Sequence, residues 1–120
     1  MRTLTIRIES DAAAALERAG QAFSASWKSG DYAGETISFE SAAALFRLLT
    51  PARWNVLSAL QVRGNSGLRE LARHMGRDPS SLLRDVNALI ERGLIEKDAE
   101  GRLFVPFARI HTEFDLAKAA

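Results

Sequence analysis

Two short helical segments separated by only three residues constrain the fold of this chain more than any other feature. Apolar side chains recur at helical spacing after Ser66, and Gly76 closes that pattern. A second pattern begins at Asp78-Pro79, where the carboxylate can accept from free helical N–H groups and proline presets φ at the first helical position. Helices joined by so short a turn cross steeply. The sequence therefore predicts a helix-turn-helix whose second helix runs over residues 79–92.

Further signals on both sides extend this unit. Thr50-Pro51 repeats the cap-plus-proline pattern and predicts a helix that ends near Arg63. Gly93 fits the left-handed position that follows the last helix. The extended runs within residues 94–105 flank a loop with glycine at its end, which is typical of a β-hairpin. A helix, a helix-turn-helix and a hairpin, in this order, make up a winged helix-turn-helix.

The remaining segments predict strands and helices around this unit. Residues 3–8 alternate between polar and apolar side chains, as a strand with one apolar face does. An alanine-rich helix over 12–25, a possible strand near 36–39 and a short helix over 41–49 follow. Residues 109–116 alternate as well. We class the fold as α+β, a winged helix-turn-helix with an N-terminal strand-helix extension and a C-terminal strand.

Strands at both termini need partners, because an isolated strand is not stable. They pair either within the chain or with a second copy. A homodimer is the simpler expectation, since it closes sheet edges and buries apolar faces. The residues expected at a dimer interface are apolar and lie near the two termini: Leu4, Ile6, Ile8, Leu16, Phe23, Ile110 and Phe114.

The predicted second helix of the helix-turn-helix offers candidate contacts to DNA bases. Burial of its apolar side chains turns a different set toward solvent or a ligand. These side chains are small, apolar or able to form paired hydrogen bonds with base edges in a major groove: Ser80, Ser81, Leu83, Arg84 and Asn87. Any short amphipathic helix also turns polar residues outward, so a solvated helix face is the alternative.

Arginine supplies most of the positive charge in the same region. From Thr50 to Arg102, nine Lys and Arg residues stand against seven Asp and Glu, although the net charge of the whole chain is only +1. Guanidinium groups bind phosphate in a paired geometry that lysine lacks. The expected phosphate contacts lie on the helix-turn-helix and the hairpin: Arg69, Arg73, Arg77, Lys97 and Arg102. Ion pairs with Glu70, Asp78 or Asp85, and protection of a sheet edge by charge at the hairpin, are the alternatives.

Composition narrows the class of protein. The chain has 120 residues, 47% of them hydrophobic, which is enough for one domain with a core. No run approaches the roughly 18 apolar residues of a membrane span, and we expect a cytoplasmic protein without a membrane partner. The absence of cysteine excludes disulfides and thiolate zinc sites. His74 and His111 have no spacing typical of a catalytic or metal site, so we expect neither an enzyme nor a cofactor.

With these motifs laid out, the chain resembles the winged helix-turn-helix transcriptional regulators, broadly MarR-like, and more closely a group of small prokaryotic DNA-binding proteins. The resemblance runs from about Phe39 to Leu116. It rests on these residues: Phe39-Glu40-Ser41, Leu49-Thr50-Pro51-Ala52-Arg53, Leu68-Arg69-Glu70-Leu71-Ala72-Arg73, Gly76-Arg77-Asp78, Arg84-Asp85-Val86, Leu89, Gly93-Leu94-Ile95, Gly101-Arg102 and Val105-Pro106-Phe107.

The resemblance implies sequence-specific binding of double-stranded DNA as a dimer. Members of the group often look like the antitoxin and self-repressor of a toxin–antitoxin pair. We therefore expect a dimeric repressor, and as the alternative an antitoxin that covers a partner toxin, with or without autoregulation. On this interpretation residues 1–49 form a dimerisation extension, 50–107 the DNA-binding unit, and 108–120 a C-terminal strand and tail.

Overall fold

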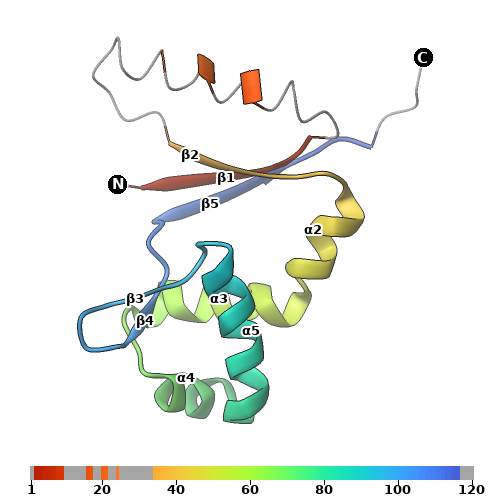
Figure 1. The fold of residues 1–120 in the computed structure, drawn as a ribbon. Coiled ribbons are helices and arrows are strands. Elements are labelled where there is room, and N and C mark those ends of the chain that lie inside the picture. Colours follow the sequence, from red (N-terminus) through yellow and green to blue (C-terminus); the bar gives the residue numbers. More distant parts are fainter. Residues whose placement is uncertain (1, 10–15, 18–19, 22–23, 25–33, 117–120) are drawn as a thin grey trace. The chain divides into compact units, whose positions relative to one another are not determined.

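The computed structural model describes residues 2–9, 16–17, 20–21, 24 and 34–116. Its named elements combine helices with two small sheets, as the α+β class predicts (Figure 1). In chain order they are β1 (Thr3–Ile8), β2 (Glu35–Phe39), α2 (Ala42–Leu48), α3 (Pro51–Arg63), α4 (Leu68–Met75), α5 (Pro79–Glu91), β3 (Glu96–Lys97), β4 (Leu103–Phe104) and β5 (Arg109–Glu113). Much of the helix expected over residues 12–25, Phe23 included, lies outside the described residues.

The chain divides into two compact units. The first combines Met1–Leu45 with Arg109–Ala120, and the second is Phe46–Ala108. The N-terminal and C-terminal segments lie far apart in the sequence but belong to one unit, because strands β1 and β5 pair with each other.

A three-stranded parallel sheet in the order β2-β1-β5 forms the first unit. In its register Ile6 of β1 lies between Ile37 of β2 and Thr112 of β5. Leu4 and Ile6 are buried, as the alternating pattern predicts. The last strand ends at Glu113, three residues before the end of the alternating pattern in the sequence. The terminal strands therefore find their partners within the chain.

Helices α3, α4 and α5 build the core of the second unit. Their buried side chains recur at helical spacing and face one another: Val56, Leu57, Leu60, Leu71, Ala72, Leu82, Val86 and Leu89. The Thr50 hydroxyl accepts from the Arg53 N–H at 3.3 Å, and the Asp78 carboxylate accepts from the Ser81 N–H at 3.0 Å. Both predicted caps are confirmed, and each precedes a proline in the first turn.

Glycine in the left-handed region ends two of these helices. Gly76 has φ 66° and ends α4, so that only Gly76, Arg77 and Asp78 separate α4 from α5. Gly93 has φ 78°, and the Leu94 N–H donates to the carbonyl of Leu89 at 2.9 Å. Leu94 itself is fully buried, which is the hydrophobic contact expected after such a helix end.

Strands β3 and β4 form the hairpin that the sequence predicts, but each strand has only two residues. Leu94 and Ile95 are buried outside the strands, so they belong to the core instead of the hairpin ladder. Ser66 adds a further bridge, since its N–H and carbonyl both bond to Leu103 at 3.0 and 2.8 Å. The connection between α3 and α4 thus fixes one edge of the hairpin.

In the part of the chain that the structure describes, no helix is both long and apolar enough to cross a membrane.

Candidate nucleic-acid interface

The exposed face of α5 carries most of the side chains predicted to contact bases. Burial of Leu82, Val86 and Leu89 turns the opposite side of the helix outward, where Ser80, Arg84 and Asn87 are exposed. Leu83 lies beside them with 42% of its surface exposed. No hydrogen bond or ion pair of the Arg84 or Asn87 side chain occurs within the described residues, so both remain available to a ligand.

Ser81 behaves differently from the other predicted base contacts. It is only partly exposed, its backbone N–H bonds to the Asp78 cap, and its hydroxyl accepts from Arg77 Nη2 at 2.9 Å. Its polar groups therefore already stabilise the start of α5.

Two arginines extend from α4 next to this face. Arg69 and Arg73 are both exposed, and neither forms an ion pair within the described residues. They lie four residues apart on one helix side, where like charges destabilise a helix by about 0.2–0.5 kcal/mol. An anion between or beside them would remove that cost.

A cavity of about 520 Å³ lies at the junction of the two helices. Its walls come from α4, the turn and the first residues of α5: Arg69, Ala72, Arg73, Arg77, Pro79 and Ser80. The structure thus brings three of the five predicted phosphate contacts to one cavity, together with one predicted base contact.

Asp85 joins Arg77 to α3 through a network of ion pairs. Its Oδ1 accepts from Arg53 Nε at 2.9 Å, and its Oδ2 forms an ion pair with Arg77 Nη2 at 2.8 Å. Arg53 also donates through Nη1 to the carbonyl of Leu48 at 2.9 Å. Burial raises the pKa of Asp85, but the hydrogen bonds and charges of the two arginines outweigh it and hold the pKa below its ordinary value.

This network favours the ion-pair alternative for Arg77 over a role that is purely phosphate binding. Its side chain is only 22% exposed and bonds to both Asp85 and Ser81. Its Nη1, however, is buried without an acceptor within the described residues, so one donor of Arg77 is unused. Arg53 was not among the predicted site residues. The sequence gives only a weak signal for it, an arginine in the first turn of a capped helix.

At the hairpin, Arg102 and Lys97 differ in their surroundings. Arg102 Nε donates to Asp98 at 3.1 Å, and its Nη2 lies 3.4 Å from Glu100. Lys97 is exposed and has no ion pair within the described residues. A phosphate would have to compete with two carboxylates for Arg102, whereas Lys97 is unengaged.

Asp98 organises the hairpin loop. The Asn65 side-chain amide and the backbone N–H groups of Glu100 and Arg102 all donate to its carboxylate. The bond from Asn65, followed by these backbone bonds and the charge of Arg102, lowers the pKa of Asp98 to about 2 despite an opposing effect of desolvation. The loop conformation therefore depends on an ionised Asp98.

A family model described as HVO_A0114 matches residues 48–112, just over half of the chain. The chain belongs to the HVO_A0114 family. The matched region of this family contains α3 to β4, and with them every predicted base and phosphate contact. No curated protein and no solved structure matches the chain.

The predicted dimerisation residues of this HVO_A0114 family member have different degrees of burial. Leu4 and Ile6 are 1% and 0% exposed, so they pack inside the chain. Ile8 and Ile110 are partly exposed, and Leu16 is 76% exposed. Phe114 is 43% exposed, whereas Phe23 lies outside the described residues. A second copy could reach Leu16 and Phe114 but not Leu4 or Ile6.

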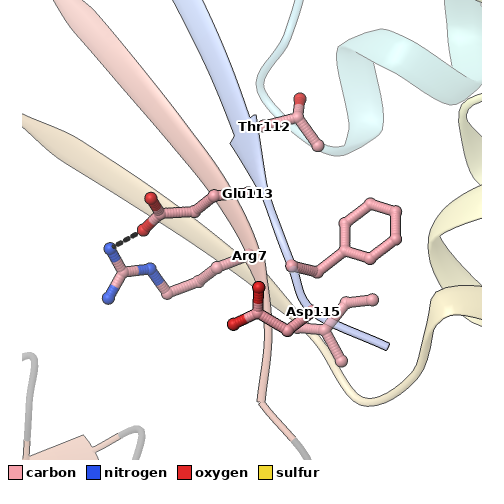
Figure 2. A pocket seen from close by; sticks show the side chains of 6 residues that line it. Arg7, Thr112, Glu113 and Asp115 are labelled. Atoms are coloured by element: carbon pink, nitrogen blue, oxygen red, sulfur yellow. Dashed lines mark hydrogen bonds and ion pairs between the residues drawn. The ribbon is translucent and has the colours of Figure 1, made fainter. Parts of the chain in front are cut away.

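A second cavity, which the sequence did not predict, lies at the carboxyl ends of β1 and β5 in the first unit. It measures about 650 Å³ and combines the Arg7 guanidinium with the carboxylates of Glu113 and Asp115. Figure 2 shows Arg7 paired with Glu113, while Asp115 lies beside them without a drawn contact. His111 Nε2 is 3.3 Å from the same Glu113. Within the described residues no group of three His, Asp or Glu side chains could hold a metal ion.

Proposed function

We propose that residues 46–108 form a winged helix-turn-helix that binds double-stranded DNA, with α5 in the major groove and the β3–β4 hairpin as the wing. The observation that carries this proposal is the combination of two unengaged sets of side chains. Arg84 and Asn87 are exposed on α5, and Arg69 and Arg73 are exposed on α4, all without partners among the described residues. Guanidinium and amide groups are the side chains that most often read guanine and adenine edges.

The proposed contact of each side chain with DNA follows from the element that carries it. Arg84 and Asn87, with Ser80 and Leu83 on the same helix, contact base edges. Arg69 and Arg73 precede the turn and contact phosphates, which position a helix in the groove without reading sequence. Lys97 adds a phosphate contact from the wing.

The regulator acts as a dimeric repressor in this proposal. Two copies of α5 read half-sites about one helical turn, roughly 34 Å, apart. Size-exclusion chromatography with light scattering at micromolar protein concentration tests the dimer directly. A monomer under these conditions would contradict the proposed dimer. We assign the protein a binding role and no catalysis.

The test is fluorescence anisotropy of the pure chain with its own promoter region and with a scrambled duplex, each at two salt concentrations, because phosphate contacts make affinity depend on salt. We expect at least a roughly thousandfold preference for the promoter. Arg84→Ala should cost about 1–3 kcal/mol on the promoter and relax specificity at one base pair, whereas Arg73→Ala should weaken both duplexes equally.

Arg47→Ala provides the matched control. Arg47 is an exposed arginine of α2 that does not line the α4–α5 cavity. Equal losses for Arg47→Ala, Arg73→Ala and Arg84→Ala on both duplexes would show unspecific charge attraction and contradict the assignment of α5 to base reading.

A second candidate function is that of an antitoxin. Leu16 is 76% exposed and Leu116 is fully exposed, so the first unit presents apolar side chains that a protein partner could cover. Coexpression with the product of the neighbouring gene tests this function. A stable complex of the two proteins that survives purification and is lost in Leu16→Asp would support it.

A further inference from the structure

The α4–α5 cavity, lined by Arg69, Ala72, Arg73, Arg77, Pro79 and Ser80, has an excess of positive charge. The carboxylates near its arginines are already engaged. Asp85 pairs with Arg53 and Arg77, and Asp78 caps α5 through the Ser81 N–H. Glu70 lies 3.9 Å from Arg63, which is outside the cavity lining. The charges of Arg69 and Arg73 are thus not balanced by an ion pair within the described residues.

Residues that line the same cavity also carry an unused neutral donor. Pro79 has no N–H, and the Ser81 N–H bonds to Asp78. The Ser80 N–H, at the second position of α5, has no acceptor in the part of the chain that the structure describes, and its hydroxyl is exposed. Arg77 also lines the cavity, but its unpaired Nη1 is buried and is not counted among these donors.

These donors share one chemical preference. The residues that line the cavity carry a free backbone N–H and two guanidinium groups without ion pairs, at the first turn of a helix, where the backbone dipole also favours an anion. A tetrahedral phosphoryl group presents several oxygen acceptors to such a set, and guanidinium forks match its geometry.

We infer that this cavity binds a single tetrahedral phosphoanion through Arg69, Arg73 and the Ser80 N–H. Arg77 forms the wall of the site, and Asp85 holds it in place. The inference rests on the proposed function in one respect: if the chain binds DNA, the occupant is one backbone phosphate next to the start of α5. A free phosphoanion has the same chemistry and is the other source.

The first experiment uses inorganic phosphate as the probe and the full chain as the receptor. Amide resonances of Ser80 and the side-chain Nε resonances of Arg69 and Arg73 are followed by NMR during titration at constant ionic strength with chloride. We expect saturable shifts at all three positions. Arg69→Gln/Arg73→Gln should weaken binding by about tenfold or more, because it removes two charge-assisted donors.

Arg47→Gln is the matched control, since it removes an exposed arginine that does not line the cavity. It should leave the phosphate affinity unchanged. Shifts that fail to saturate, or an equal loss in the control, would overturn the site. Arg69 and Arg73 are exposed and make no ion pair within the described residues, so the double variant should fold, which its melting curve verifies.

The second experiment identifies the source of the phosphoanion from the salt dependence of duplex binding. Each phosphate contact contributes about 0.9 to the slope of log K against log salt. Loss of one shared phosphate predicts that the slope of the double variant falls by about 0.9. A fall of about 1.8 would mean that each arginine binds a phosphate of its own and would overturn the single-anion site. An unchanged slope with intact phosphate titration supports the site and assigns it to a free phosphoanion.

Different experimental outcomes would refute the phosphoanion site and the binding of DNA. Phosphate binding that requires both arginines, without any duplex binding, would support this site and refute the proposed function. Duplex binding that requires Arg84, without a phosphate titration at Ser80, would refute this site and leave the proposed function intact.

Discussion

Replacement of Asp85 by asparagine should destabilise the second unit, because this carboxylate neutralises two arginines. Its oxygens form ion pairs with Arg53 at 2.9 Å and with Arg77 at 2.8 Å. The side chains are 22% exposed for each arginine and 16% for Asp85. Asparagine keeps the shape of the side chain but removes the negative charge and one acceptor. Asp85→Asn therefore leaves two largely buried guanidinium groups without a counter-ion.

The expected magnitude follows from this degree of burial. Breaking a fully buried pair costs about 3–5 kcal/mol, whereas exposed pairs contribute about 0–1 kcal/mol. The network lies between these limits, so we expect Asp85→Asn to lower the free energy of unfolding by about 2 kcal/mol at pH 7. Urea denaturation monitored by far-UV circular dichroism measures this difference, provided that the slope with denaturant stays the same.

The pH dependence gives an independent check. The folded pKa of Asp85 lies below its ordinary value of 3.8, so the folded protein holds the proton less tightly than the unfolded chain. The stabilisation is therefore fully present above about pH 4 and is lost as the pH falls through the folded pKa. The stabilities of the wild type and of Asp85→Asn should converge at low pH. A loss below about 0.5 kcal/mol at pH 7, the usual limit for surface substitutions, or a constant difference down to low pH would refute this account.

Three further predictions concern single positions in the second unit. Asp98 has a folded pKa of about 2, so the hairpin loop should stay ordered from neutral pH to below pH 4 and lose its order as the pH falls toward 2. The amide shifts of Glu100 and Arg102 report this change. An unchanged loop in Asp98→Ala would contradict the role of the Asp98 carboxylate. Gly93→Val should cost about 1–2 kcal/mol through strain alone, since φ is 78° and a side chain there would meet open space. Gly67→Ala, at φ −68°, is its control and should cost less than Gly93→Val, because only the weaker capping of α4 by alanine opposes it and no positive φ is strained. Leu82→Ala should cost about 2–5 kcal/mol in urea denaturation because Leu82 is fully buried between the helices, and a cost below 1 kcal/mol would show that α5 is packed differently.

Much of the second unit could be predicted from the sequence, because its signals are local. Helix caps and left-handed glycines act on backbone groups within a few residues, as at Thr50, Asp78, Gly76 and Gly93. Their effect can therefore be recognised from the local sequence alone. Helical spacing likewise indicates which face of α5 is buried and which is open to a ligand. The candidate base contacts follow from that face, although their role stays a prediction.

Other features depended on contacts between distant residues. The pairing of β1 with β5 joins residues such as Arg7 and Glu113, and no local pattern distinguishes this pairing from one with a second copy. The hairpin strands are also shorter than their extended runs, because Leu94 and Ile95 are drawn into the core after α5.

The candidate DNA interface also combines features that the sequence determines with features that depend on contacts between distant residues. Arginine content and helical position by themselves determined which side chains could meet DNA. Only the tertiary structure decided which of them are already engaged, since Asp85 of α5 pairs with Arg77 in the turn and with Arg53 on α3. An ion pair forms wherever the fold brings opposite charges within a few ångströms, and that distance is a property of packing and not of sequence spacing.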